Sequence, residues 1–325
     1  MRKHLKVIML GFVILVWGVC SSTSGRAYGA ISTATMQEID RVNEKGPYLG
    51  IIVPNSFEMN PLLQSPSFVA DLKVPYLDYF GITTQLLLIL FKVKGVLHYG
   101  IAGNANPQLQ IGDVTIPRYW AHTGLWNWQR YGDGTSEELA LESNGDYTRE
   151  IGYLRFANYQ NASENGKPID NFLNNVWYQP EEVFPADGIP EVRQHSFWVP
   201  VNKHYFKVAK RIEGMTFQGC VSSTCLPRAP RAVRVKNGAS ANAFVDNSAY
   251  REFLNSKFNI TPIDMESAAV ALVCHQQQIP FIAIRALSDL AGGGSAVSNE
   301  ADIFASLAAQ NAVDASLRFI TLLFP

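Results

Sequence analysis

Three acidic residues stand where their side chains could carry out acid–base chemistry. Asp289 follows a short apolar run, Glu58 follows another, and Glu266 begins a stretch of small and apolar residues. In open α/β sheets, ligands bind outside the carboxyl ends of the strands, so acids at these places indicate a reaction site. Each acid also has an ordinary structural interpretation, as a turn cap or as a first-turn residue that complements a helix dipole.

The element expected to position Glu266 is a helix. Pro262 and Asp264 suit a helix start, because a fixed φ and a negative charge are both favoured in the first turn. Met265–Cys274 is then small or apolar on nearly every side, which is typical of a helix packed against a sheet. Pro280 ends the segment, so Glu266 lies near its beginning and faces either solvent or a pocket.

The element expected to position Asp289 is a buried strand. Phe281–Leu287 is short and mostly apolar with one charge, Arg285, which favours a central strand of a parallel sheet. This strand would end on Asp289, before a glycine-rich turn. A second buried-strand pattern, Leu49–Val53, precedes the loop that carries Glu58.

The sequence around these acids resembles a known family. Asp264–Ala269 (DMESAA) and Ile284–Asp289 (IRALSD) are similar to the paired signature of the nucleoside phosphorylase superfamily. The branch closest in resemblance is the purine nucleosidases acting on methylthioadenosine and adenosylhomocysteine. Within the superfamily the chain looks most like the plant bark and vegetative storage proteins, and weaker similarity extends from about Tyr48 to the C-terminus. The resemblance implies an α/β fold, a three-layer αβα sandwich with a mixed, twisted central sheet.

The resemblance also implies a role for each candidate residue. Asp289 would donate a proton to the leaving purine, and Glu58 would activate a water molecule. Glu266 would bind the ribose hydroxyls, and Met265 would pack on the sugar. Phe244 matches a phenylalanine that stacks on the purine in the family, although burial in the core is an equal alternative for a phenylalanine.

Two positions bear on whether water or phosphate would be the nucleophile. Where phosphorolytic hexameric relatives have an arginine, this chain has His98, and where they have a phosphate-binding serine or threonine it has Ile101. Phosphate needs charge-assisted donors, whereas an isoleucine side chain offers none and a neutral histidine at most one. The sequence therefore favours water, with Glu58 to activate it. His98 also fits the interpretation of a hydrogen-bonded core histidine.

The resulting hypothesis is a purine nucleoside N-ribohydrolase that cleaves the N-glycosidic bond of adenosine-type nucleosides with water. The alternatives are a phosphate-dependent phosphorylase, a vegetative or bark storage protein with weak or no activity, and a module that binds nucleosides without turnover. No Cys or His spacing fits a metal site, so neither a metal nor a cofactor is expected. The expected partner is a small-molecule purine nucleoside or base, and a symmetric homo-oligomer is the default.

Composition and charge limit the other possibilities. The chain has 325 residues, of which 47% are hydrophobic and 17% charged, enough for one large domain with an ample core. A formal net charge of −1 gives no electrostatic reason to expect nucleic acid as a partner. Residues 30–325 are expected to form a single domain whose folded part begins at Tyr48, with an aromatic and polar insertion around residues 118–200.

The N-terminus has the pattern of a signal peptide. Arg2, Lys3 and Lys6 precede the uncharged apolar stretch Val7–Cys20, and a small, polar run comes after it. Residues 1–29 are therefore predicted to be a cleaved leader with an approximate end, and the apolar stretch is short for a membrane anchor. The leader predicts a protein of the secretory pathway, in the vacuole or the extracellular space, with no membrane association after cleavage.

Two further features fit this route. Sequons at Asn161 and Asn259 are potential glycosylation sites. Cys220 and Cys225 are close in sequence and could form a local disulfide in an oxidising compartment. Cys274 lies in the apolar helix and is expected to be a buried thiol.

Amphipathic patterns predict the remaining helices at Asn202–Arg211, Asn247–Lys257 and Ser298–Phe324. Val233–Val235 is expected to be a strand that runs into the loop carrying Phe244. The last helix has acids in its first turn and a continuous apolar stripe, so it should cover the sheet.

Overall fold

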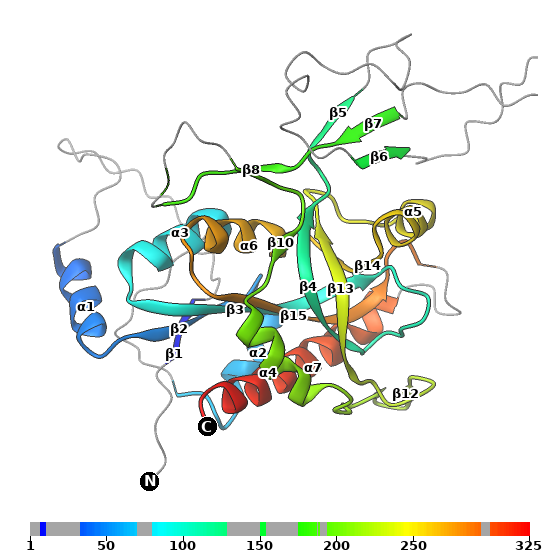
Figure 1. Cartoon of the computed structure of the whole chain (residues 1–325). Coiled ribbons are helices and arrows are strands. Elements are labelled where there is room, and N and C mark those ends of the chain that lie inside the picture. The colour runs from blue at the N-terminus through cyan, green and yellow to red at the C-terminus, as the bar shows by residue number, and fades with distance from the viewer. Residues whose placement is uncertain are drawn as a thin grey trace, which may run out of the picture.

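The computed structural model describes residues 7–10, 33–69, 80–128, 150–153, 175–186, 188, 194–293 and 300–325. An eight-stranded mixed sheet forms its centre, and helices cover both of its faces (Figure 1). The predicted three-layer αβα architecture is confirmed. The sequon at Asn161 lies outside the described residues.

The strands of the central sheet come from the whole length of the chain. In chain order they are β1 (Val7–Leu10), β2 (Tyr48–Ile52), β3 (Val93–Asn104), β4 (Val114–His122), β10 (Val199–Pro200), β13 (Ala232–Ser240), β14 (Ile260–Asp264) and β15 (Phe281–Leu290). Their order in space is β1–β2–β3–β14–β13–β4–β10, and β15 pairs with both β3 and β4.

Five of these strands close into a ring, because each of them pairs with two others. β15 is parallel to β3 and antiparallel to β4, while β13 is parallel to β4 and to β14. β14 meets β3 in antiparallel register, with Pro262 opposite Asn104 and Ile263 opposite Gly103. Closure therefore brings the carboxyl end of β14 against the carboxyl end of β3.

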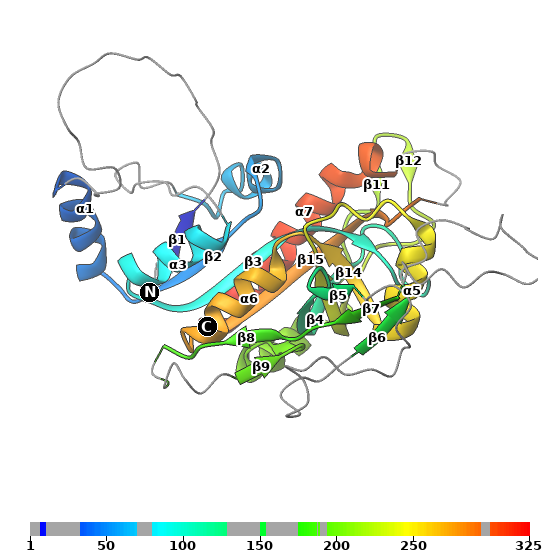
Figure 2. The ribbon, with the colours of Figure 1, turned by 90° about the horizontal axis from the view of Figure 1, so that it is seen from above.

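Helices cover the two faces of the sheet. Those described are α1 (Thr33–Glu44), α2 (Ser56–Leu63), α3 (Phe80–Leu90), α4 (Lys203–Ala209) with the 3₁₀ turn η2 (Lys210–Ile212), α5 (Ser248–Phe258), α6 (Ser267–Gln276) and α7 (Glu300–Leu323). α2, α4 and α7 share one core, and α1, α3 and α6 share the other. α7 lies below the sheet in Figure 1 and α6 above it, and Figure 2 shows α6 running along β15.

The alternation of side chains along β15 explains how one strand serves both cores. Ile282 and Ile284 point into the core that α7 covers, whereas Phe281 and Ala283 point into the core that α6 covers. Arg285 is next in the second series, so its charged side chain enters the sheet on the α6 side. A buried charge must find partners there, since an unpaired one is very costly.

The segment before α6 corrects one prediction. Ile260–Asp264 is strand β14 and not the start of a helix, so Pro262 lies in a strand, and α6 begins only at Ser267. The proline is tolerated because the pairing of β13 with β14 is irregular beside it. The strand has only five residues, and its Pro262 and Asp264 also fit the first turn of a helix, so no local pattern separates the two.

Several boundaries also differ from the predictions. β15 continues to Leu290, one residue past Asp289. The domain does not begin at Tyr48, because α1 precedes it and adds Ile39 and Val42 to the core. The predicted helices near residues 202–211, 247–257 and 298–324 are confirmed as α4 with η2, α5 and α7, and the predicted strand Val233–Val235 lies in the first half of β13.

Between β4 and β10, the described parts of the 118–200 region form two small sheets. One has the order β5 (Trp126–Trp128), β7 (Asn175–Tyr178), β6 (Glu150–Tyr153), and the other pairs β8 (Glu181–Val183) with β9 (Gln194–Ser196). Tyr178 and Phe197 are buried against Phe258 of α5, in a third core. This region thus packs on the end of the central sheet next to α5.

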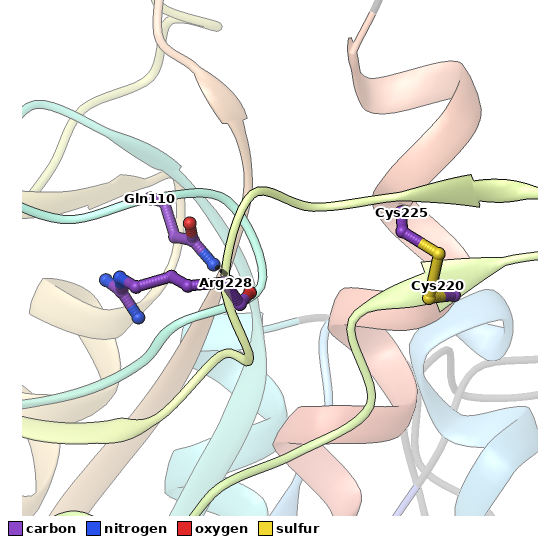
Figure 3. The surroundings of a disulfide bond; sticks show 4 residues. All are labelled: Gln110, Cys220, Cys225 and Arg228. Atoms are coloured by element: carbon purple, nitrogen blue, oxygen red, sulfur yellow. Dashed lines mark hydrogen bonds between the residues drawn. A yellow bond between two sulfur atoms is a disulfide. The ribbon is translucent and has the colours of Figure 1, made fainter.

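Cys220 and Cys225 form a disulfide that joins β11 (Cys220–Val221) to β12 (Thr224–Cys225) (Figure 3). Cys274 is a buried free thiol, so both predictions about cysteines are confirmed. The chain then reaches Arg228, whose carbonyl accepts a hydrogen bond from Gln110 Nε2 at 2.7 Å. The guanidinium of Arg228 donates two hydrogen bonds to the buried carboxylate of Asp113.

The predicted leader is partly described. Val7–Leu10 pairs in parallel with Leu49–Ile52 and forms an outer strand of the sheet. Cleavage near residue 29 would remove this strand and leave β2 at the edge, and the leader itself stays a prediction. Among the helices in the described ranges, none is both long enough and apolar enough to cross a membrane.

Candidate active site

A cavity of about 180 Å³ lies where the carboxyl ends of the ring strands meet. It contains all five residues that the sequence singled out, from α2, β15 and the segments after β13 and β14. Its lining residues are Asn55, Glu58, Ile101, Ala102, Gly103, Ala243, Phe244, Val245, Ile263, Asp264, Met265, Glu266, Ser288, Asp289 and Ala291. Four of them are carboxylic acids, and no lysine, arginine or histidine is among these described residues.

Glu58 lies in the first turn of α2, as its structural interpretation predicted, yet it is only 3% exposed. Asn55 caps this helix by accepting from Glu58 N at 3.0 Å, and its Nδ2 donates to Glu58 Oε1 at 2.7 Å. Ile101 N donates to Glu58 Oε2 at 2.6 Å. Each carboxylate oxygen therefore has one fixed donor and keeps room for another, such as a water molecule.

Gly100 makes this approach possible. A Cβ at this position would lie 2.0 Å from Glu58 Oε2 and 2.2 Å from Arg285 Nη1. Any side chain on residue 100 would therefore separate the glutamate from the arginine. The glycine is needed for space rather than for backbone conformation.

Glu266 stands between the end of β14 and the start of α6. It occupies the N-cap position but does not cap the helix with its side chain. Asp264 does so instead, since its Oδ1 accepts from the N–H groups of Glu266 and Ser267, both at 3.1 Å. The carboxylate of Glu266 is therefore free to face the cavity and Arg285.

Arg285 is the fully buried cation behind this cavity. Its Nε lies 2.7 Å from Asp264 Oδ2, its Nη1 3.6 Å from Glu58 Oε2, and its Nη2 3.4 Å from Glu266 Oε2. Ser267 Oγ and the carbonyl of Ile101 accept further hydrogen bonds from it, at 3.0 and 3.3 Å. One guanidinium thus serves three carboxylates.

His98 is a fully buried histidine, as its structural interpretation predicted. Its Nδ1 lies 3.0 Å from the carbonyl of Ile52, which can only accept, so Nδ1 carries the hydrogen. Nε2 then accepts from Arg285 Nη2. Burial, and after it the charge of Arg285, lower the pKa of His98 well below its usual range, so the ring is neutral and offers no donor to the cavity.

Asp289 lies near the end of β15, and its Oδ1 accepts a hydrogen bond from Ser288 Oγ at 2.6 Å. The turn after it is held in place by α5, because Arg251 donates to the carbonyls of Ala291 and Gly293. Gly292 has a positive φ of 90° and packs so closely on the start of α5 that a Cβ would clash with its backbone. The strand end is therefore fixed on both sides of the acid.

Burial changes the acidity of three carboxyl groups here. It raises the pKa of Glu58 to about 7 even though Arg285 opposes the change, and it does the same for Glu266, where Asp264 adds repulsion. Burial also raises the pKa of Asp289, which Ser288 opposes and the charge of Asp246 assists. The cavity can therefore hold protons near neutral pH.

Met265 and Phe244 form the apolar part of the cavity. Met265 is 47% exposed and Phe244 is 68% exposed, although both are large apolar side chains. The alternative of a core aromatic is therefore wrong for Phe244. Exposed apolar surface beside buried carboxylates suits a ligand with one flat apolar part and one hydroxylated part.

The sequence missed several contributors to this site. Arg285 was noted only as a lone charge in a strand, and Asp264 only as a helix start, while Ser240, Ser267 and Asn55 were not singled out. A charge inside a buried strand does signal buried partners, because charged residues are rarely fully buried unless paired. Their identity depends on the ring closure, which no local pattern encodes.

His98, Asp264 and Glu266 each offer a ligand atom within 4.8 Å of the others, a spacing that a metal ion could use. The guanidinium of Arg285 contacts all three residues, so the place is filled by a cation already. The described residues therefore offer no room for a metal at this cluster.

Two other cavities are larger but lack this chemistry. One of about 760 Å³ lies between β12 and α5 and is mostly apolar, with Glu252 as its one acid among the described lining residues. One of about 530 Å³ lies at the opposite end of β15, near Cys274 and His275. Neither contains any of the five predicted residues, so the candidate cavity is not the largest of these three.

Comparison with known proteins places these features in context. The family model described as "Phosphorylase superfamily" matches residues 81–321. Bark storage protein A of Populus deltoides is 32% identical over 241 residues, which cover 73% of this chain and 68% of that protein. The 5'-methylthioadenosine/S-adenosylhomocysteine nucleosidase of Anoxybacillus flavithermus is 42% identical over 73 residues, 22% of this chain and 32% of that protein.

A solved structure gives the same fold at low identity. A mutant of the Helicobacter pylori 5'-methylthioadenosine/S-adenosylhomocysteine nucleosidase, crystallised with 5'-methylthioadenosine in its active site, superimposes with a TM-score of 0.52 at 18% identity. The similarity covers 85% of this chain and 99% of that one. At this identity the similarity shows the fold only, so the reaction must be inferred from the residues of the cavity.

Proposed function

Because this chain belongs to the phosphorylase superfamily, we propose that it is a purine nucleoside N-ribohydrolase that cleaves the N-glycosidic bond of adenosine-type nucleosides with water. The observation that carries the proposal is the acidic cavity. Four carboxyl groups line it, no described cationic side chain does, and Arg285 behind it is engaged by three carboxylates. Such a cavity suits a neutral or cationic ligand.

Cleavage of an N-glycosidic bond develops positive charge on the sugar and negative charge on the departing base. An acid must protonate the purine, and a base must activate water at the anomeric carbon. Asp289 is proposed as the acid, since burial keeps its proton available at higher pH than for an exposed aspartate. It would donate to N7 of the purine.

Glu58 is proposed as the base. Asn55 and Ile101 fix its two oxygens, and a pKa of about 7 makes it a useful base near neutral pH. Its ionised form would accept a proton from water on the sugar side of the cavity. Its negative charge would also stabilise the positive charge that develops on the ribose.

The other predicted residues would hold the substrate. Glu266, with no capping duty in its helix, would accept hydrogen bonds from the ribose hydroxyls. Met265 would pack on the sugar, and Phe244 would stack on the base, an arrangement supported by the exposure of both side chains at the cavity.

A phosphorylase is the main alternative. Phosphate binding requires donors with positive charge, and the described residues at this cavity supply none that is free. Ile101 gives its N–H to Glu58, His98 is neutral and turned toward Arg285, and Arg285 is surrounded by carboxylates. Phosphate would enter against four acids.

A storage role is supported by the similarity of this chain to storage proteins. Bark storage proteins A and B of Populus deltoides are 32% and 31% identical to this chain over 241 residues. A storage role does not require catalytic acids, whereas Glu58, Glu266 and Asp289 of this chain line one cavity and have polar partners there. The two roles are compatible in one protein.

Product analysis separates these functions. We would incubate adenosine and inosine with the full chain, with and without phosphate, and separate base, ribose and ribose 1-phosphate. Base and free ribose in both conditions would support the hydrolase. Ribose 1-phosphate that forms only with phosphate would mean a phosphorylase, and the absence of any product would leave storage or binding.

Compartment and assembly are part of the proposal. The predicted leader would direct the protein to the vacuole or the extracellular space, which mass spectrometry of the secreted N-terminus would test. A homo-oligomer is proposed on the general frequency of symmetric assemblies. Light scattering on the purified protein would test it.

A further inference from the structure

Three carboxylates share one cation in the core of this site. Glu58 comes from α2, Asp264 from the end of β14, and Glu266 from the segment before α6, while Arg285 comes from β15. All four side chains are largely removed from water. The group therefore carries more acids than its single guanidinium can neutralise.

Asp264 takes the largest share of that cation. Its Oδ2 is 2.7 Å from Arg285 Nε and accepts from the hydroxyl of Ser267 at 2.5 Å, and its Oδ1 accepts from the hydroxyl of Ser240 at 2.5 Å. Two backbone N–H groups donate to its Oδ1 as well. The hydrogen-bond acceptors of this carboxylate are all in use. The two terminal nitrogens of Arg285 are therefore left to interact with the other two acids, Glu58 and Glu266.

Glu58 and Glu266 approach different nitrogens of the same guanidinium. Glu58 Oε2 lies 3.6 Å from Nη1, and Glu266 Oε2 lies 3.4 Å from Nη2. Neither distance is that of a short charge-assisted hydrogen bond, which is about 2.7–2.9 Å. Two buried like charges at one shared cation repel each other, and the proton affinity of each depends on the state of the other.

We propose that Glu58 and Glu266 titrate as one coupled pair through Arg285, so that Glu266 sets the proton affinity of the water-activating glutamate in addition to holding the ribose. This inference deepens the proposed function and rests on it for the role of Glu58. Glu266 is in this respect a positioning residue that acts on Glu58 through the guanidinium. Burial is the main cause of the raised pKa of Glu58, and the charge of Glu266 raises this pKa further.

The other titratable groups around the pair are accounted for. His98 on β3 is neutral, and Tyr99 on the same strand keeps its proton, because burial and then the charge of Glu58 raise its pKa. Asp264 is held by Arg285 and two serines, and its charge raises the pKa of Glu266. Asp289 is held by Ser288 and is not among the described carboxylates that pair with Arg285. The exchange of one proton is therefore between Glu58 and Glu266.

A titration of the carboxyl groups tests this directly and needs no turnover. We would label the glutamate side chains with ¹³C and follow their NMR shifts with pH in the wild-type chain, in Glu58→Gln and in Glu266→Gln. In Glu266→Gln the titration of Glu58 should move to lower pH by about one pH unit or more. In Glu58→Gln the titration of Glu266 should move down by the same amount, because coupling is reciprocal.

Asp289→Asn is the matched control. It removes an acid from the same cavity without changing a residue that pairs with Arg285. In this variant the titrations of Glu58 and Glu266 should each shift by less than about a third of the shift measured in the two glutamine variants. Equal shifts in all three variants would overturn the specific role of the guanidinium. Unchanged or unequal shifts in the two glutamine variants would overturn the coupling itself.

Kinetics provide a second readout. The acid limb of the pH profile of kcat/KM, which reports the free enzyme, should move to lower pH in Glu266→Gln by the same amount as the NMR titration of Glu58. A loss of rate with an unmoved limb would indicate that Glu266 only binds ribose, and would contradict the inference while leaving the hydrolase intact. Coupled NMR titrations in a chain without hydrolysis would sustain the coupling and remove the proposed function.

Discussion

Two arginine–aspartate pairs in this chain look alike locally and differ in what surrounds them. Asp113 is fully buried and accepts two hydrogen bonds from Arg228, whose side chain is 37% exposed. It also accepts from the N–H groups of Gln110 and Arg231. One cation meets one anion there, and the remaining lone pairs are used by the backbone.

Asp264 and Arg285 also form a buried ion pair, but this pair has further acidic neighbours. Arg285 is completely buried, and Glu58 and Glu266 add two more acids to its surroundings. A balanced pair holds a loop in place, whereas an excess of buried acid stores protons near neutral pH. The difference teaches that the charge balance around a buried pair indicates chemistry better than the pair alone.

Removal of the central cation should have the largest effect. Arg285→Met leaves three buried carboxylates without their partner, and the loss of one member of a buried pair typically costs about 3–5 kcal/mol. We expect the free energy of unfolding to fall by about that amount at pH 7.5, and by less at pH 5, where the acids can be protonated. Urea denaturation at both pH values measures this, and equal losses would speak against excess acid at this site.

Loss of the proposed acid should affect the rate rather than the fold. Asp289→Asn should lower turnover by about 10²-fold or more, since general acid catalysis contributes roughly 10²–10⁴-fold. Binding of a non-hydrolysable purine nucleoside analogue, measured by calorimetry, should persist. Normal turnover in this variant would remove Asp289 from the mechanism.

The balanced pair should show the opposite behaviour. Asp113→Asn keeps the shape of the side chain but removes the charge that Arg228 faces, so stability should fall by about 1–3 kcal/mol. Turnover at a temperature where the variant is folded should stay within about two-fold of the wild-type value, because no atom of this pair lines the acidic cavity. A rate loss comparable to that of Asp289→Asn would erase the distinction between the two pairs.

The pH dependence of stability provides a further test. Burial raises the pKa of Glu58 and of Glu266 from 4.5 to about 7, so the folded chain binds more protons than the unfolded chain between these values. The free energy of unfolding should therefore decrease as pH rises from 4.5 to 7, by about 2–3 kcal/mol for each acid. Urea midpoints should show this decrease in the wild-type chain and a flatter profile in Glu266→Gln, and a stability that rises through this window would refute the excess of buried acid.

Much of the acidic site could be predicted from the sequence because strand ends and motifs are local. The runs before Asp289 and Glu58 have the composition of buried strands, and ligands gather at the ends of such strands. Residues 81–321 match the family model, and Glu58 lies outside this range. The evidence that Glu58 belongs to the site is therefore its position in the cavity. The structure brings it to Glu266 and Asp289, while its chemical role stays a prediction.

The parts that could not be predicted depend on contacts between distant segments. Nothing near Arg285 in the sequence says that Glu58 and Asp264 will meet it. β14 was missed because it has only five residues and because Pro262 and Asp264 also fit a helix start. The exposure of Phe244 is likewise set by the cavity and not by its neighbours, so the default of burial failed.

The ring of strands also governs when the site can exist during synthesis. β15 fits between β3 and β4, and Val96 pairs with Phe281, so a slot in the sheet stays open until the ribosome has released nearly the whole chain. The open slot presents two unpaired strand edges, a surface prone to aggregation, and contacts this distant in sequence form slowly. A nascent chain that stops before β15 therefore has neither Arg285 nor Asp289, and it exposes unpaired strand edges until its last segment arrives.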